Sequence, residues 1–311
     1  MSSFSPTGMG WLPDLPDARD RTFMHPTVRR LITSLDGYAG LQLPGEIDLR
    51  SDDEGVYFGT VEDQGSLDCS PVFAVLSLIE YFERKIHGRQ FHGSRLFLHK
   101  VTRNLLRRPN SSPGNTHSGM DLGVDLRSTF KALTIFGVPP SRYWPYSSEN
   151  VDREPSQFLY GLASQPSDLI YFRLDARNQS GSETWGILTS FLTAGFPVAF
   201  GFSMPSSVTE KPEIYYRGEF EAAAGGHAVV AVGFELHRFG TGQHALLIRN
   251  SWGRDWGDGG YGWLPSAFVA NQLARDFWTC IDASWFLNDE MGAIPIAGEL
   301  SCPDVVAEQD Q

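Results

Sequence analysis

Cysteine is scarce in this sequence of 311 residues, which contains only Cys69, Cys280 and Cys302. Three scattered cysteines are too few for a disulfide framework and do not have the spacing of a zinc site. The eight histidines form no pair at helical or strand spacing, so we expect no bound metal and no cofactor. The scarcity of cysteine favours a reducing compartment, and we expect the protein to be cytoplasmic.

Long apolar runs and excess basic charge are also lacking. No stretch approaches the roughly 20 apolar residues that a membrane span needs. The first twenty residues have neither the basic start nor the apolar segment of a secretory signal. Lys and Arg number 25 against 37 Asp and Glu, a net charge of −12, whereas phosphate binding needs a basic face. We therefore expect neither a membrane nor a nucleic acid as a partner.

The two halves of the chain have different periodicities. Apolar residues at helical spacing predict helices at about 72–87, 94–106 and 126–136. Apolar and β-branched runs bounded by Gly or polar clusters predict strands at 196–204, 227–236 and 244–250. Helices followed by a sheet indicate an α+β protein with two lobes, and a cleft between lobes is a usual place for a substrate site.

Three segments carry residue types used in catalysis. The first is a loop that runs into the first predicted helix, the second is a histidine at the start of an apolar strand, and the third is rich in Trp and Gly. Their sequences are QGSLDCSPVFA from Gln64, GGHAVVAVG from Gly225, and RNSWG from Arg249, which Trp256-Gly257 and Gly259-Gly260-Tyr261-Gly262 extend.

The order of these segments resembles that of the papain-like (C1) cysteine peptidases: Gln, nucleophile, His, then Asn-Ser-Trp-Gly. Weaker similarity at Leu43-Pro44 through Arg50, at 136–138 and at 144–146 extends the resemblance over residues 44–270. It implies a helical left lobe (about 60–145), a β-barrel-like right lobe (about 146–290) and an active-site cleft between them. Residues 1–43 would be a covering arm or short prosegment, and 291–311 an acidic tail.

The resemblance also implies a role for each site residue. A nucleophile at a helix N-terminus lies at the positive end of the helix dipole, which stabilises a thiolate. His227 would pair with it and protonate the leaving amine, and Asn250 would orient His227. Gln64 would hold the oxyanion with a backbone N–H. The expected substrate-binding residues are Gly119, Gly123, Gly226 and Trp252, the last of which would also shield the His–Asn bond.

The nucleophile position holds a serine. In the family the nucleophile lies six residues after the Gln and ten before a Glu, and counting from Gln64 or back from Glu80 reaches Ser70. Cys69 misses both counts by one, and one residue turns a side chain by about 100° in a helix. We therefore assign Ser70 to the nucleophile position and expect Cys69 to be a small buried residue.

The same residues have structural interpretations when each is taken alone. Ser70 before Pro71 is a good helix start, with Ser as the N-cap and Pro at the first helical position. His227 on an apolar strand would more often be a core histidine. The combination of motifs favours the catalytic interpretation.

Ser70 leaves several functions open. A hydroxyl does not ionise near neutrality, so the ion pair cannot form and we expect the chain to be inactive or nearly so. The serine could be an engineered trap or a natural variant. The hypotheses are a thiol endopeptidase of peptide or protein substrates that lacks its nucleophile here, a non-catalytic module that binds peptides or regulates a partner, and a serine-nucleophile hydrolase or acyl transferase. In each of them, residues 1–43 would run near or through the cleft.

Overall fold

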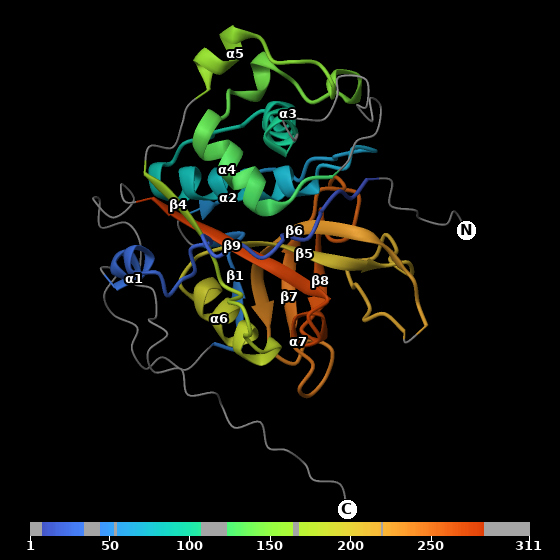
Figure 1. Cartoon of the computed structure of the whole chain (residues 1–311). Helices are drawn as coiled ribbons and strands as arrows, with labels where there is room; N and C mark the ends of the chain where they lie inside the picture. The colour runs from blue at the N-terminus through green and yellow to red at the C-terminus, as the bar shows by residue number, and fades with distance from the viewer. Residues whose placement is uncertain are drawn as a thin grey trace, which may run out of the picture.

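The structure is a computed structural model that describes residues 8–33, 44–52, 55–106, 123–163, 168–218 and 220–282. In this part of the chain, a layer of helices lies on one large antiparallel sheet (Figure 1). This arrangement confirms the predicted α+β fold with two lobes, and each predicted helix and strand is present within a few residues of its expected position. The predicted tail and Gly119 lie outside the described residues.

The helical lobe is built around α2 (Ser70–His87), which is buried at nearly every residue as far as Phe82. A helix that is apolar on most sides must contact neighbours all round. Helix α2 accordingly contacts two helices on one side and two strands of the sheet on the other. It ends at Gly88, whose φ of 60° is in the left-handed region that favours glycine. The other elements of this lobe are α3 (Arg95–Leu106), α4 (Leu126–Phe136), α5 (Gln157–Leu162) and the 3-10 turns η1 (Ser141–Tyr143) and η2 (Ser148–Asn150).

A buried ion pair joins α2 to α3. Both terminal nitrogens of Arg95, which is 3% exposed, donate to the Glu80 carboxylate, with Nη2 2.8 Å from Oε2. The Arg95 Nε lies 2.6 Å from Oε2 of Glu62 in the loop before α2. The helix that carries the catalytic candidate is thus fixed at its middle by a doubly bonded guanidinium.

The large sheet forms the second lobe and has the strand order β4-β9-β5-β6-β7-β8, with β1 also paired to β6. Its longest strand is β6, which pairs with different strands at its two ends. Near its start His227 lies opposite Phe202 of β5, and near its end Gly233 lies opposite Asp48 of β1. The strands are β1 (Glu46–Asp48), β4 (Leu169–Arg173), β5 (Val198–Pro205), β6 (Ala223–Glu235), β7 (Ala245–Arg249), β8 (Tyr261–Pro265) and β9 (Ala274–Asp282); β2 (Ser51–Asp52) and β3 (Gly55–Val56) form a separate hairpin.

Two helices lie beside this sheet on the side away from α2 (Figure 1). They are α6 (Gly181–Thr193) and the short α7 (Ala267–Ala270). Helix α6 begins with a capping box in which Ser180 and Glu183 satisfy each other's backbone N–H groups. The sheet core is therefore closed by helices on both faces.

The arm, of which residues 8–33 are described, crosses the molecule where the two lobes meet (Figure 1, dark blue). The Trp11 N–H donates to the Gly226 carbonyl of β6, and Trp11 forms a parallel bridge with Val124 just before α4. Further on, Thr22 forms a parallel bridge with Arg173 of β4, and the arm then turns into α1 (Pro26–Thr33). The arm is thus bonded to both lobes, and it contains a helix that the sequence did not predict.

The start of α2 and the boundary between the two lobes can be compared with what the sequence indicates. The structural alternative for Ser70, that it caps α2, does not hold, because Cys69 has the cap position without a side-chain hydrogen bond and the Ser70 hydroxyl bonds to Ala228. The expected lobe boundary near residue 146 stays a prediction. However, the ring of Tyr160 in α5 packs against Phe97 and Phe136 of the helical lobe.

Candidate active site

Ser70 lies at the junction of the two lobes, as the first residue of α2. Its side chain is fully buried, and its Oγ accepts a hydrogen bond of 3.0 Å from the backbone N–H of Ala228, the residue after His227. Its own backbone N–H points to the arm and donates to the carbonyl oxygen of Met9 over 3.0 Å. The structure thus brings Ser70 and the start of β6 together at the positive end of a long helix.

His227 and Asn250 form a buried pair across β6 and the end of β7. The His227 Nε2 lies 2.7 Å from Asn250 Oδ1, which also accepts from the Ser251 N–H at 2.8 Å. Since Oδ1 is an acceptor, the network assigns the proton of neutral His227 to Nε2. His227 Nδ1 is buried and has no hydrogen-bond partner, which leaves it unprotonated and able to take a proton.

Burial sets the charge state of this histidine. Loss of water around the fully buried ring lowers the pKa of His227 from 6.5 to about 4, and the bond to Asn250 only partly opposes this effect. The Trp252 ring lies 4.6 Å from the imidazole ring, centroid to centroid, and covers one face of it. His227 is therefore neutral at pH 7 when a hydroxyl, and not a thiolate, stands at position 70.

Gln64 is fully buried, and its amide orientation is fixed by three bonds. The Ser251 hydroxyl donates to Oε1 over 2.5 Å, so Nε2 must face the other way. There Nε2 donates to the Leu67 carbonyl at 2.8 Å and to the Met9 carbonyl at 3.1 Å. Gln64 Nε2 and the Ser70 N–H thus converge on one oxygen atom, which is the geometry of an oxyanion hole.

The arm occupies this hole and the surface on both sides of it. The Met9 N–H donates to Asp68 Oδ1 at 3.0 Å, and the Trp252 Nε1 donates to the Gly8 carbonyl at 3.0 Å. On the other side the Leu12 N–H donates to the Val124 carbonyl at 3.1 Å. Residues 8–12 therefore lie as an extended segment through the junction that holds Ser70.

Two of the predicted substrate-binding glycines contact this segment closely. A Cβ added to Gly123 would lie 2.1 Å from the Gly10 carbonyl oxygen, and one added to Gly226 would lie 2.4 Å from that of Trp11. Only a glycine leaves room for an extended chain at these positions. Gly119, the third predicted glycine, lies outside the described residues. The catalytic and binding roles of all these residues remain predictions.

Cys69 points away from the other candidates. It is fully buried, its Sγ lies 3.0 Å from the Tyr146 hydroxyl, and it packs in a small cluster with Leu67, Phe73 and Leu96. The expectation that Cys69 is a small buried residue is confirmed. Its neighbour Ser70 is the residue that bonds the start of β6 at Ala228 and shares the Met9 carbonyl with the Gln64 amide.

Sequence reasoning missed the arm residues that fill the site and the pocket that receives Trp11. The Trp11 indole is 7% exposed and lies against Gly201 of β5, where an added Cβ would come within 1.9 Å of the ring. The indole Nε1 is buried without a hydrogen-bond partner, so shape and apolar contact hold the ring. The available signal was the pair Trp11-Leu12 between Gly10 and Pro13, in an arm otherwise rich in polar residues.

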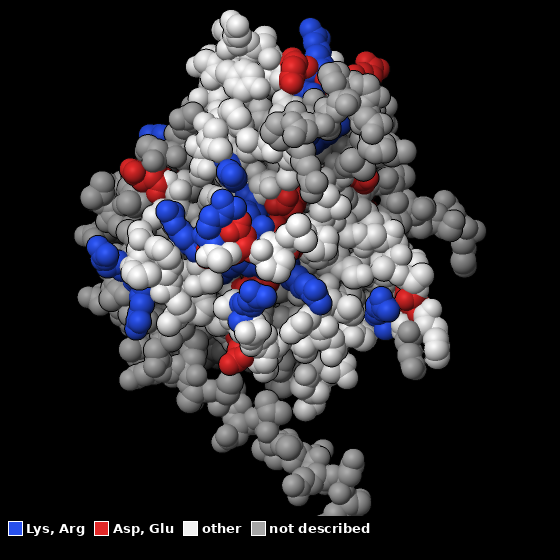
Figure 2. Space-filling view, viewed as in Figure 1, with Lys and Arg blue, Asp and Glu red and all other residues white. Residues whose placement is uncertain are grey.

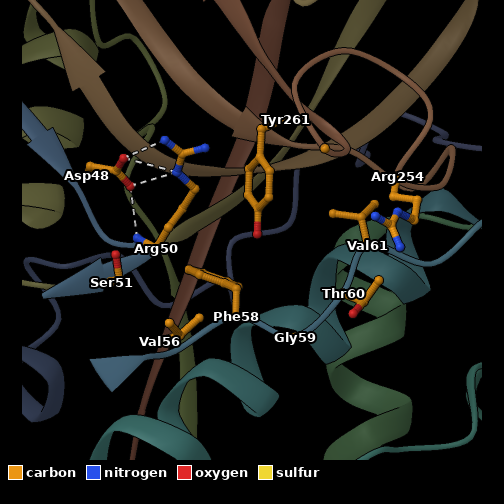
Figure 3. Close-up of a pocket in the computed structure, with 11 residues that line it drawn as sticks. Asp48, Arg50, Ser51, Val56, Phe58, Gly59, Thr60, Val61, Arg254 and Tyr261 are labelled. Carbon is orange, nitrogen blue, oxygen red and sulfur yellow. Dashed lines mark hydrogen bonds and ion pairs between the residues drawn. The ribbon is translucent and has the colours of Figure 1, made fainter. Parts of the chain in front are cut away.

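A hollow of about 510 Å³ lies apart from this site (Figure 3). Asp48 and Arg50 form a bidentate ion pair on one side of it, and the Tyr261 ring stands between Arg50 and Arg254. Neither Ser70 nor His227 lines this hollow. Within the described ranges, no group of three His, Cys, Asp or Glu side chains could hold a metal ion. Each helix in these ranges is too short or too polar to span a bilayer.

Comparisons with known proteins agree with this geometry. Residues 141–272 match the sequence profile of the papain family of cysteine proteases. An uncharacterized peptidase C1-like protein from Acanthamoeba polyphaga mimivirus is 30% identical over 224 residues, which are 70% of this chain and 68% of that protein. Xylellain, a cysteine protease from Xylella fastidiosa, is 27% identical with a TM-score of 0.67, and the match covers 89% of this chain and 96% of that chain.

More distant structures share the fold alone. Procathepsin B from Trypanosoma congolense is 16% identical with a TM-score of 0.60, over 88% of this chain and 85% of that chain. A digestive procathepsin L from Tenebrio molitor is 18% identical with a TM-score of 0.54, over 84% of this chain and 79% of that chain. On the identity and coverage of the viral relative, together with the matched profile, this chain belongs to the papain family of cysteine peptidases.

Proposed function

We propose that this chain is a latent papain-like endopeptidase that acts on peptides or proteins and lacks its catalytic sulfur at position 70. The observation that carries the proposal is the convergence of Gln64 Nε2 and the Ser70 N–H on one carbonyl oxygen, 3.1 and 3.0 Å away. Two fixed donors on one oxygen would stabilise the oxyanion of a tetrahedral intermediate. The arm carbonyl of Met9 stands in for that oxygen.

With cysteine at position 70, the surrounding residues can carry the whole reaction. The thiol proton passes to His227 Nδ1, and the thiolate attacks the scissile carbonyl carbon, whose oxygen takes the negative charge in the hole. The imidazolium then gives its proton to the leaving amine as the C–N bond breaks. Water, deprotonated by His227, releases the acid from the sulfur. Asn250 holds the ring in position throughout.

With serine at this position, the resting state lacks the ion pair. A hydroxyl keeps its proton near neutrality, and the low pKa of the buried His227 makes it a weak base. An oxygen in a site shaped for sulfur would also lie about 1 Å from its best position, which can reduce the rate on the order of a hundredfold. We therefore propose that the chain as it stands is inactive or nearly so.

We further propose that the arm is an inhibitory prosegment. Met9 fills the oxyanion hole, Trp11 fills an apolar pocket, and Gly8 bonds to Trp252, so a substrate cannot enter while residues 8–12 are in place. A reducing, cytoplasmic location is also proposed, and the buried thiols of Cys69 and Cys280 are consistent with it.

A second candidate function is a non-catalytic module that binds peptides or regulates a partner. The neutral, sulfur-free centre favours it, because such a site could still hold an extended segment as it holds the arm. A third and weaker candidate is a hydrolase or acyl transferase that uses Ser70 directly.

One comparison separates these three functions. The full chain, its Ser70→Cys variant and a Ser70→Ala control would be assayed on a broad peptide library and with a thiol-reactive suicide inhibitor. Cleavage and labelling only in Ser70→Cys would support the peptidase. Silence in all three proteins, together with peptide binding, would support the non-catalytic module. Activity in the parent that is lost in Ser70→Ala would support the third function. Mass spectrometry of the N-terminus of Ser70→Cys under reducing conditions would show whether the arm is removed.

A further inference from the structure

The arm is fixed a second time beyond the cleft, in a cluster of carboxylates and guanidiniums. This cluster consists of Asp14 and Asp20 from the arm, Arg127 from α4, Arg173 and Asp175 from the end of β4 and the following loop, and Asp276 from β9. We call it the arm cluster. Basic and acidic side chains gather on the face where these elements meet (Figure 2).

Asp14 is the most enclosed member of the arm cluster. Its carboxylate is fully buried, and Oδ2 accepts from Trp278 Nε1 at 2.7 Å and from Arg173 Nη1 at 3.4 Å. Its backbone N–H donates to Asp276 Oδ2 at 2.8 Å. Oδ2 therefore has one neutral and one charged donor, Oδ1 accepts a long bond of 3.4 Å from the Arg127 backbone N–H, and a second carboxylate lies close by.

The backbone of β9 is distorted where it meets the arm. Asp276 has a φ of 58°, which is rare for a residue other than glycine, and the pairing of β5 with β9 shifts there. This conformation lets Asp276 accept from the arm backbone while Arg173 donates to its other oxygen at 2.8 Å. Such a conformation persists only where surrounding contacts maintain it. The arm cluster is thus a built feature of the fold.

Acidic groups outnumber basic groups around Asp14. The groups that face it are Arg127 and Asp125 of α4, Arg173 and Asp175 beside β4, Asp276 of β9 and Asp20 of the arm. The body alone therefore presents three carboxylates to two guanidiniums, and docking of the arm adds two more carboxylates. A buried site with this excess of negative charge favours the protonated form of its least hydrated carboxyl.

We propose that docking of the arm takes up a proton at Asp14, so that the arm is held at acidic and neutral pH and released as the pH rises above neutrality. The functional consequence of this inference, access to the site at Ser70, rests on the proposed inhibitory role of the arm, because release of the arm would uncover that site. The docked state is the one with the buried carboxyl, and the free arm has an ordinary, hydrated aspartate.

The pKa values agree in sign with this proposal. Burial, and next the charge of Asp276, raises the pKa of Asp14 from 3.8 to about 8 in the docked arm. A group with a raised pKa in the docked state stabilises docking fully below its free pKa, and this stabilisation is lost as the pH rises to about 8. Burial also raises the pKa of Asp276, and that of Asp175 to about 6.

Protonation of His227 has the opposite effect on release of the arm from protonation of Asp14. It therefore sets the lower limit of the pH range in which release should increase with pH. Burial lowers the pKa of His227 to about 4, so to the extent that departure of the arm returned the ring to water, His227 would favour release below pH 6.5 and would have no effect above it. The two effects therefore oppose each other between about pH 4 and 6.5. Above about pH 6.5 the carboxyl groups of the arm cluster act without this opposition, and the proton of Asp14 alone should raise the arm-opening constant by up to ~tenfold per pH unit as far as about pH 8.

Hydrogen exchange of the full chain tests this directly. The amides of Trp11, Leu12 and Asp14 are bonded to the body of the protein only while the arm is docked. Their opening constants, corrected for the chemical exchange rate, would be measured from pH 6 to 9 in the parent and in Asp14→Asn, which is neutral at every pH. Asp17→Asn is the control, because Asp17 lies on the same arm but its carboxylate is bonded to its neighbour Arg19 and not to a member of the arm cluster.

The expected result is a rise of at least tenfold in opening between pH 6.5 and 8 in the parent and in Asp17→Asn, and little change in Asp14→Asn. A flat profile in the parent, or an equal slope in Asp14→Asn, would overturn the proposal. If Asp14→Asn does not fold, the profile of the parent alone decides. The measurement needs no catalysis, so a failed peptidase assay on Ser70→Cys would leave it valid.

Discussion

The backbone N–H of Ser70 donates to the carbonyl oxygen of Met9, at the position where an oxyanion would form. The site is therefore already bonded to a peptide carbonyl, and that carbonyl belongs to the same chain. Residue 70 is covered while the arm is docked and exposed when the arm is released. A measurement of arm docking therefore also reports on access to residue 70.

The buried imidazole of His227 should make the fold sensitive to acid. Its pKa is lowered to about 4, so its contribution to stability is complete above its unfolded pKa of 6.5 and is lost as the pH falls through 4. The free energy of unfolding of the parent should therefore fall by about 3 kcal/mol more than that of His227→Gln between pH 7 and 4. Urea unfolding at several pH values measures this difference. His87→Gln, a change outside the site, should behave like the parent, and parallel curves for parent and His227→Gln would contradict the prediction.

The contact between Trp11 and Gly201 should determine how tightly the arm docks. Trp11→Ala removes a nearly buried indole and should cost about 3–5 kcal/mol of docking. Gly201→Ala places a methyl group against the ring and should cost about 1–3 kcal/mol. Trp11→Phe should cost less than Trp11→Ala, because the indole N–H has no partner to lose.

A double-mutant cycle separates this contact from general damage to β5. In the Trp11→Ala background, Gly201→Ala should cost almost nothing, because the ring that it displaces is absent. Hydrogen exchange of the Leu12 amide is the measurement. Gly186→Ala on α6, where an added Cβ meets nothing within 4 Å, is the matched control. Equal costs of Gly201→Ala in both backgrounds would exclude a direct contact.

The ion pair of Glu80 and Arg95 should be essential for stability. Glu80→Ala leaves a guanidinium that is 3% exposed without its main partner, which typically costs about 3–5 kcal/mol. Glu62→Ala removes only the more exposed partner and should cost clearly less. Denaturant unfolding at pH 7 compares the two variants. Adding Arg95→Met to Glu80→Ala should recover much of the loss, and no recovery would indicate that volume matters more than charge.

Cys69 should be unreactive although it is adjacent to the nucleophile position. It is fully buried beside the Tyr146 hydroxyl, so a thiol reagent should not modify it in the folded parent. In Ser70→Cys, treatment with iodoacetamide for long enough for the arm to open, followed by peptide mapping, should find modification at position 70 and none at 69. Ser70→Cys combined with Cys69→Ala should be labelled to the same extent. Modification of Cys69 in the parent would contradict the assigned register.

The main elements were predictable because each depends on local pattern. The apolar stripe from Val72 to Ile86 defines α2, and the motif order around Gln64, His227 and Asn250 predicts residues that the fold then brings together. The assignment of Ser70 to the nucleophile position rests on counting and stays a prediction. The local interpretation of Ser70 as the cap of α2, which Ser-Pro alone would favour, does not hold, because the hydroxyl of Ser70 accepts a bond from a distant strand. Local rules contain no information about such a partner.

The occupants of the site could not be predicted in the same way. Met9 reaches the oxyanion hole across 55 residues of sequence, and nothing near Met9 indicates that partner. Asp14 stands in a stretch with the composition of an exposed loop, yet its side chain is fully buried because Arg173 and Trp278, far along the chain, provide its donors. Long-range pairing of this kind depends on the assembled fold.

The arm and the body are fixed on either side of residues 34–43. Before them, Thr22 pairs with the edge of β4, and after them, Glu46–Asp48 form β1 on the far half of β6. A single cut between these two anchors would therefore leave both halves seated and would not by itself free the site. It would instead convert a tethered inhibitor, held at an effective concentration in the millimolar range, into a separate peptide whose occupancy falls on dilution. Activation would then depend on protein concentration, and the arm peptide released from one cut molecule would be able to bind and inhibit another.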